Sequence, residues 1–193
     1  MILWTIQPEK IYQSIMKNGV YRCDFKQSCM QTWKRQYDWL VAQMKQRIGK
    51  APTGVDHPVW AWYQWEGDRK KPDLRKERWS YGWKGERFVC LEIEVPDAEV
   101  LLSDFDLWSI ILLDGLVSYS EDEEKSFEAR YNALSEDEQR VMKEKNWERV
   151  FDLIGDNNMQ TAGEQSVQAT FWELRKKQIC NVRMFVAATP KPE

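Results

Sequence analysis

The chain has 193 residues, of which 42% are hydrophobic and 31% are charged, and its net charge is −3, a composition typical of soluble globular proteins. Its purely apolar runs, such as residues 110–113, are far shorter than the roughly 20 residues of a membrane-spanning helix, which excludes a transmembrane class. The start of the sequence, MILWTIQPEK, lacks the basic beginning and the long apolar stretch of a secretory signal. We therefore expect a cytoplasmic protein without membrane contact.

The charge is distributed unevenly along the chain. Residues 1–91 contain 17 basic and 9 acidic side chains, whereas residues 92–148 contain 5 basic and 17 acidic ones. A basic front half favours an anionic ligand there; the alternative is that the basic and acidic surfaces neutralise each other within the fold. The cysteines show no CxxC spacing, and a chain of this length buries enough surface without cross-links. We therefore expect reduced thiols and no metal site.

The front half predicts short strands and two helices. Residues 2–6 are apolar with a β-branched threonine, which favours a strand. Residues 8–19 predict a helix that proline opens and glycine ends. Residues 20–23 predict a second short strand, and residues 28–48 a long helix with a Ser–x–x–Gln capping box at its start. Residues 59–65 alternate aromatic and smaller side chains, as a strand does.

The second half begins with a strand and continues with helices. Residues 87–95 alternate strictly between an apolar face and a face that carries two glutamates, which predicts a half-buried strand. Residues 104–113 predict a helix. Two more helices are expected to begin at Ser120 and Ser135, because each serine is followed three residues later by a glutamate that can complete a capping box.

The last predicted elements are two strands, residues 167–174 and 182–187. Strands at both ends of the chain around a helical middle predict an α+β fold. We expect one domain, residues 1–193, with a mixed sheet formed by the N- and C-terminal strands, because no linker or repeat divides the chain.

The most informative segment for function has aromatic and basic residues interleaved. Between residues 58 and 87 the sequence contains Trp60, Trp62, Trp65, Arg69, Lys70, Lys71, Arg75, Lys76, Arg78, Trp79, Trp83, Lys84 and Arg87. We call residues 59–79 the aromatic–basic segment. Rings that stack on planar ligands, beside cations that neutralise phosphate, are typical of nucleotide and nucleic-acid sites. Asp73 is expected to pair with Arg75 inside the loop; the alternative is a fully solvated loop.

Other candidate residues are isolated. The chain has no GxGxxG, GxxxxGK[ST] or HExxH motif. His57 has no partner at metal-ligand spacing, which favours a structural role. Glu92 and Glu94 share one strand face, either as a carboxylate pair or as an ordinary solvent-facing pair. Glu173 follows an uncharged apolar stretch, so it either points outward or serves a cleft.

Five segments of the chain are distinctive: LWTIQP, YDWLVAQM, PVWAWYQWEG, KPDLR and VQATFWELRKKQICNVRMF. Together they resemble a bacterial family known as a domain of unknown function, and the resemblance covers essentially the whole chain. A second resemblance, in chain order, is to ADP-ribosyltransferases, especially the DNA-targeting toxins. The opening strand and its glycine-terminated helix resemble the NAD-binding start of those enzymes. The late strand beginning Gln168-Ala169 resembles the strand with their catalytic glutamate. The resemblance implies an ADP-ribosyltransferase-like fold, in which a carboxylate assists cleavage of the nicotinamide–ribose bond.

The chain departs from that pattern in both strands. Gln7 stands where those enzymes often have histidine or arginine, and Thr170 stands where the glutamate is expected. The nearest acid, Glu173, is three positions further on, and an odd offset places a strand side chain on the opposite face unless a bulge intervenes.

The sequence therefore predicts a cleft that binds a nucleotide, NAD or a nucleic-acid strand, with no required cofactor. The candidate catalytic residue is Glu173, and the candidate ligand-binding residues are Thr5, Gln7, Trp62, Tyr63, Arg69, Arg75 and Arg78. Thr5 and Gln7 would hydrogen-bond the ligand, the ring of Trp62 or Tyr63 would stack on a base, and the arginines would contact phosphate. The alternative is a non-enzymatic module whose tryptophans dock a protein partner. The sequence leaves the oligomeric state open.

Overall fold

The computed structural model describes residues 1–23, 32–77, 80–153 and 165–188. The strands are β1 (Ile2–Pro8), β2 (Val20–Tyr21), β3 (Val59–Gln64), β4 (Arg87–Glu94), β5 (Leu101–Asp104), β6 (Val167–Phe171), β7 (Leu174–Arg175) and β8 (Ile179–Val186). The helices are α1 (Glu9–Asn18), α2 (Lys34–Arg47), α3 (Leu74–Glu77), α4 (Phe105–Leu112), α5 (Glu121–Asn132) and α6 (Glu136–Trp147), with 3₁₀ turns at Asp97–Glu99, Glu148–Phe151 and Lys176–Gln178. The expected α+β class, with a helical middle, is confirmed. None of the helices in these ranges is both long and apolar enough to cross a bilayer.

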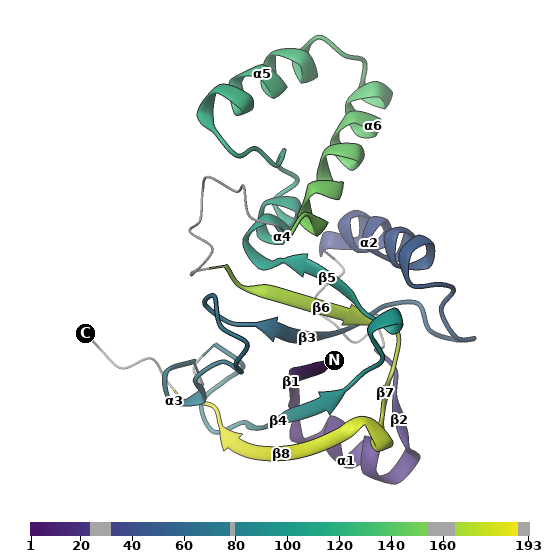
Figure 1. Ribbon diagram of the computed structural model, residues 1–193, viewed down its shortest axis with the longest axis vertical. Coiled ribbons are helices and arrows are strands. Elements are labelled where there is room, and N and C mark those ends of the chain that lie inside the picture. Colours follow the sequence, from purple (N-terminus) through teal and green to yellow (C-terminus); the bar gives the residue numbers. More distant parts are fainter. Residues whose placement is uncertain (24–31, 78–79, 154–164, 189–193) are drawn as a thin grey trace.

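Six strands form one sheet in the order β5-β6-β3-β1-β4-β8 (Figure 1). Trp4 of β1 lies opposite both Trp62 of β3 and Glu92 of β4, so the first strand occupies the centre. The sheet was expected to be mixed, but every pairing in it is antiparallel. In Figure 1, β1 lies between β3 and β4, as these pairings require.

The two faces of the sheet carry separate cores. On the face that packs on α1, which we call the α1 face, Leu3, Leu91 and Ala169 form one cluster with residues of α1 and β7. The opposite face, which we call the α2 face, packs on α2, α4 and α6 and includes Trp60. Successive strand residues point to opposite faces, so β3 contributes Ala61 to the first cluster and Trp60 to the second.

The strand expected over residues 167–174 is broken in the structure. β6 ends at Phe171, and Leu174 begins β7, which pairs with β2 in a separate two-stranded ribbon. Trp172 is buried in the α2-face core, where its indole donates to the Gly49 carbonyl, whereas Leu174 is buried in the α1-face core. Residues two apart on one straight strand share a face, so the chain must turn between these two side chains.

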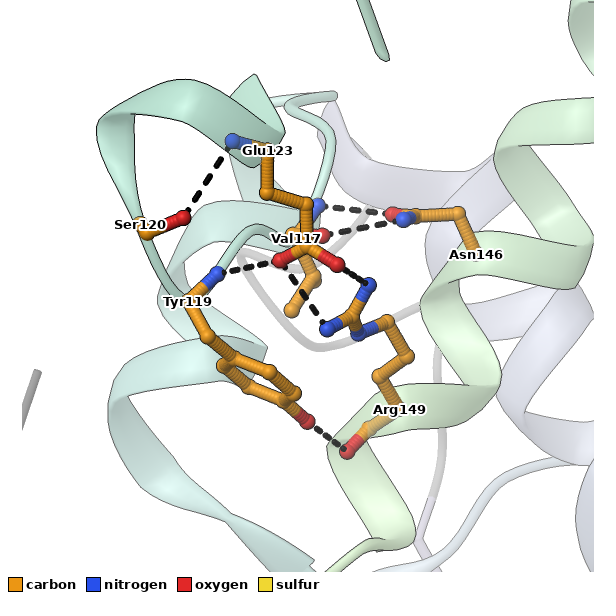
Figure 2. Close-up of polar contacts among 6 residues, drawn as sticks. All are labelled: Val117, Tyr119, Ser120, Glu123, Asn146 and Arg149. Atoms are coloured by element: carbon orange, nitrogen blue, oxygen red, sulfur yellow. Dashed lines mark hydrogen bonds and ion pairs between the residues drawn. The ribbon is translucent and has the colours of Figure 1, made fainter. Parts of the chain in front are cut away.

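Helices α5 and α6 form a hairpin that projects away from the sheet in Figure 1. The capping box predicted at Ser135 is confirmed, whereas the one predicted at residues 28–31 lies outside the described residues. Figure 2 shows how the base of the hairpin is held. The Glu123 carboxylate accepts two bonds from Arg149, of 2.8 and 3.1 Å, and one from the Tyr119 amide. Asn146 of α6 donates to the Val117 carbonyl and accepts from its amide (Figure 2).

Candidate functional site

The aromatic–basic segment does not present its rings to one common recess. Trp62 lies on the α2 face, where its ring meets Phe105 edge-on at 5.2 Å and Trp65 at 4.5 Å. Its neighbour Tyr63 packs against the α1-face core, because adjacent residues of a strand point to opposite sides. Tyr81 is hydrogen-bonded to Trp62, and burial raises the pKa of its hydroxyl.

Two of the candidate arginines in this segment contact the protein itself. The Arg69 guanidinium lies 3.5 Å from the centre of the Tyr63 ring and donates to the Ile2 carbonyl at 2.9 Å. Arg75 makes the expected bidentate bond with Asp73, at 3.0 and 2.8 Å, and this contact lowers the pKa of the Asp73 carboxyl. Arg78 lies outside the described residues. Arg69 therefore fastens the segment to β1, and Arg75 stabilises its own turn.

Thr5 and Gln7 of β1 are also engaged in hydrogen bonds within the protein. The Gln7 amide donates to the Thr5 hydroxyl at 2.8 Å, and that hydroxyl donates to the Trp60 carbonyl at 2.7 Å. Thr5 is fully buried and lies directly opposite Leu91, which places both β1 residues on the α1 face. They are thus separated by the sheet from Trp62.

Glu173 lies in the turn between β6 and β7, within a network of alternating charges. Its carboxylate accepts from Arg22 at 3.0 Å and from Arg175 at 2.9 Å, and Arg175 also contacts Glu99 at 3.4 Å. The Glu173 side chain is only 10% exposed. Burial acts to raise the pKa of this carboxyl, but the bonds from the two arginines outweigh that effect and lower it. Glu173 is therefore an anion at neutral pH, which makes it an acceptor rather than a proton donor.

A groove of about 700 Å³ opens beside Glu173. It is lined by Asn18, Gly19, Val20, Arg22, Glu173, Arg175, Lys176 and Lys177. The end of α1 and the β2–β7 ribbon build its walls. Gly19 has a φ of 83°, a left-handed conformation that glycine adopts without strain, and it turns the chain directly from α1 into β2. Its carbonyl then accepts from the Lys176 amide at 2.8 Å, which fixes the two lysines at the rim.

The groove is basic, and part of its charge is uncompensated. Four cations and one carboxylate line it. Arg22 and Arg175 are paired with Glu173, whereas Lys176 and Lys177 form no ion pair with any residue that the structure describes. No group of three or more potential metal ligands occurs in the described ranges. The arrangement is suited to an anionic organic ligand.

The sequence pointed to part of this groove. The Arg175-Lys176-Lys177 run begins two residues after Glu173, so the sequence alone shows that these charges lie near it. The same is not true of Arg22, since it is 151 residues away from Glu173 in the chain. The structure thus brings Glu173 together with Arg175, which follows it closely in the chain, and with Arg22, which follows β2, and not with the aromatic–basic segment.

Comparison with known proteins gives a family and no function. None of the curated proteins and none of the solved structures is detectably similar to this chain. A family profile matches residues 2–180, a range that includes every residue of the groove. The chain therefore belongs to the family described as a domain of unknown function, DUF3841.

Proposed function

We propose that the protein binds a nucleotide in the groove beside Glu173. The observation that carries the proposal is the combination of two lysines, Lys176 and Lys177, that form no ion pair with any described residue, with a carboxylate that two arginines keep ionised. The Lys176 ammonium donates to the Met16 carbonyl at 3.5 Å, at the long end of the hydrogen-bond range. Unpaired ammonium groups attract phosphate, and a buried anion beside them accepts hydrogen bonds from ligand hydroxyls. A nucleotide carries phosphate and ribose hydroxyls side by side, so it complements both halves of the groove.

The aromatic–basic segment is a less suitable binding site for the phosphate than the groove. The guanidinium groups of Arg69 and Arg75 are already bonded to Ile2 and Asp73, and the rings of Trp62 and Tyr63 lie on opposite faces. A phosphate bound by Arg69 or Arg75 would have to compete with these contacts, whereas Lys177 forms no ion pair with any described residue. The proposal therefore keeps the nucleotide and Glu173 and places the phosphate at the lysines.

A relation to ADP-ribosyltransferases is part of the same proposal. It is supported by the β1–α1 opening that ends at Gly19 and by the position of β6, which only β3 separates from β1 in the sheet. Thr170, which replaces the expected glutamate, is fully buried, and its hydroxyl donates to the Leu101 carbonyl. This position offers no group to a ligand, so the proposal concerns binding and includes no reaction.

The test is calorimetric titration with ADP-ribose, NAD, AMP and inorganic phosphate, at low and at physiological salt. We expect binding that weakens with salt, since phosphate contacts are electrostatic. The double variant K176Q/K177Q should bind about 5- to 30-fold more weakly, because each exposed charge contact contributes up to about 1 kcal/mol. R75Q/K76Q removes an equal pair of adjacent cations from the aromatic–basic segment and serves as the matched control.

Three results separate the alternatives. Weaker binding in K176Q/K177Q alone supports the groove. Weaker binding in R75Q/K76Q alone would move the ligand to the aromatic–basic segment. The absence of binding by any of the four ligands at low salt would refute the proposal.

A further inference from the structure

One face of α6 is left exposed among the residues that the structure describes. The inward face of this helix contributes Asn146 and Trp147, which are buried. The outward face carries Glu138, Val141 and Lys145, each three or four residues from the next. These positions form one continuous stripe on a helix. Figure 1 shows that the α5–α6 hairpin projects away from the sheet.

The middle of this stripe is apolar. The Val141 side chain is 63% exposed, and Met142 beside it is partly exposed. A shallow groove of about 400 Å³ runs along it, lined by Arg130, Asp137, Glu138, Val141, Met142 and Lys145. An exposed apolar centre with a charged rim is the usual composition of a docking surface.

The stripe is acidic at one end and basic at the other. Asp137 and Glu138 lie at the N-terminal end of α6, and Lys145 lies near its C-terminal end. Lys145 and the neighbouring Arg130 form no ion pair within the described part of the chain. When two such helices meet in antiparallel orientation, about a centre between Val141 and Met142, each Glu138 faces a Lys145. In parallel orientation, like charges would meet.

We propose that this face of α6 docks a second copy of the chain, as a two-fold antiparallel helix pair. Each Val141 packs against Met142 of the other copy, and the Glu138–Lys145 contact forms twice, as an isologous interface requires. The charge pattern fits this occupant because one surface supplies both the acid and the base. The pairing is independent of the nucleotide groove.

The base of the hairpin makes this face a firm docking surface. Arg149 is held by Glu123 and stacks on the Tyr119 ring at 3.9 Å, while Asn146 is bonded to Val117 (Figure 2). The C-terminal half of α6 is thus fixed to the body of the protein, and little ordering is required on binding. A single helix pair is a small interface, so we expect weak association that depends on concentration.

The test is sedimentation velocity of the full chain over a wide concentration range. We expect the sedimentation coefficient to rise from the monomer value to the dimer value. V141E should weaken the association about tenfold or more, because a charge replaces the apolar centre. Leu113 is also strongly exposed, at 83%, but lies at the end of α4, and L113E is the matched control that should associate normally.

Charge reversal identifies the partner and its orientation. K145E and E138K should each weaken association, because both create like-charge pairs, and E138K/K145E should restore it, because the swapped charges again match. E138K also removes the capping box at Ser135, but the double variant lacks it too, so restoration cannot come from the cap. A monomer at all concentrations, an unaffected V141E, or no restoration in the double variant would each overturn the proposal.

Discussion

The Glu173 carboxylate should contribute measurably to stability, and its replacement by glutamine shows how much. The side chain is 10% exposed, but its partners Arg22 and Arg175 are 46% and 34% exposed. Fully exposed ion pairs contribute about 0.2–1 kcal/mol, and hydrogen bonds to buried charges about 1.5–3 kcal/mol. Glutamine keeps one acceptor oxygen and loses one charged contact. Because both arginines are partly exposed, water can solvate them in the variant, which reduces the loss. We therefore expect Glu173→Gln to lower the free energy of unfolding by about 1–2 kcal/mol at neutral pH.

The pH dependence of that loss tests its origin. The folded-state pKa of Glu173 lies below its ordinary value, so its stabilising effect is complete above the unfolded pKa, which is about 4.3. The effect is lost as the pH falls through the lower folded pKa, where the wild type becomes protonated as well. Urea unfolding of the wild type and the variant should therefore give curves that differ from pH 7 to about pH 4.3 and converge below it.

Glu94→Gln is the control for this experiment. Glu94 is exposed, and its replacement should change the unfolding free energy by less than about 0.5 kcal/mol. If Glu173→Gln were no more destabilising than this control, or if its effect persisted at acid pH, the carboxylate would not be held by the two arginines as described.

Three further changes have defined outcomes. Asn146→Ala leaves a buried backbone N–H and C=O without partners, so urea unfolding should show a loss of about 2–4 kcal/mol. Burial raises the pKa of the Cys90 thiol to about 11, so at neutral pH iodoacetamide should label the exposed Cys180 before Cys90, as read by mass spectrometry. Gly82→Ala places a Cβ 2.7 Å from the Phe88 ring, and thermal unfolding should show a loss of about 1–3 kcal/mol.

Each of these outcomes can be contradicted directly. A loss below about 1 kcal/mol in Asn146→Ala would mean that water replaces its bonds to the backbone. Labelling of Cys90 as fast as Cys180 would show that the strand β4 opens under native conditions. An unchanged melting temperature in Gly82→Ala would show that the Phe88 ring yields without cost.

Local signals predicted local structure well. The alternation of residues 87–95 predicted β4, but its second face is only partly exposed, because Phe88 and Cys90 are buried there and Glu94 is exposed. Asp104 marked the start of a helix, and its carboxylate accepts from the amides of Asp106 and Leu107 in α4. Ser135 predicted the start of α6 in the same way. Each of these signals depends on residues within a few positions of one another.

The candidate site depends on distant segments, and there the sequence was less informative. Aromatic and basic residues in one segment suggested a ligand surface, but the spacing of Trp62 and Tyr63 on one strand already required opposite faces. That Arg69 would stack on Tyr63 and reach Ile2 depends on β1 lying beside β3, which no local pattern specifies. The groove depends on Arg22 reaching Glu173, and only the β2–β7 ribbon brings them together.

The central position of β1 has a consequence for how the chain folds. Its two neighbours in the sheet come from residues 59–64 and 87–94, and β4 then pairs with the last strand, β8. Large loops must therefore close before the sheet gains its hydrogen bonds, which slows folding to about the millisecond-to-second range. Helices α4, α5 and α6 lie between β5 and β6, and their backbone hydrogen bonds join residues only four apart. We therefore expect the circular-dichroism signal of helix to appear before the sheet is assembled.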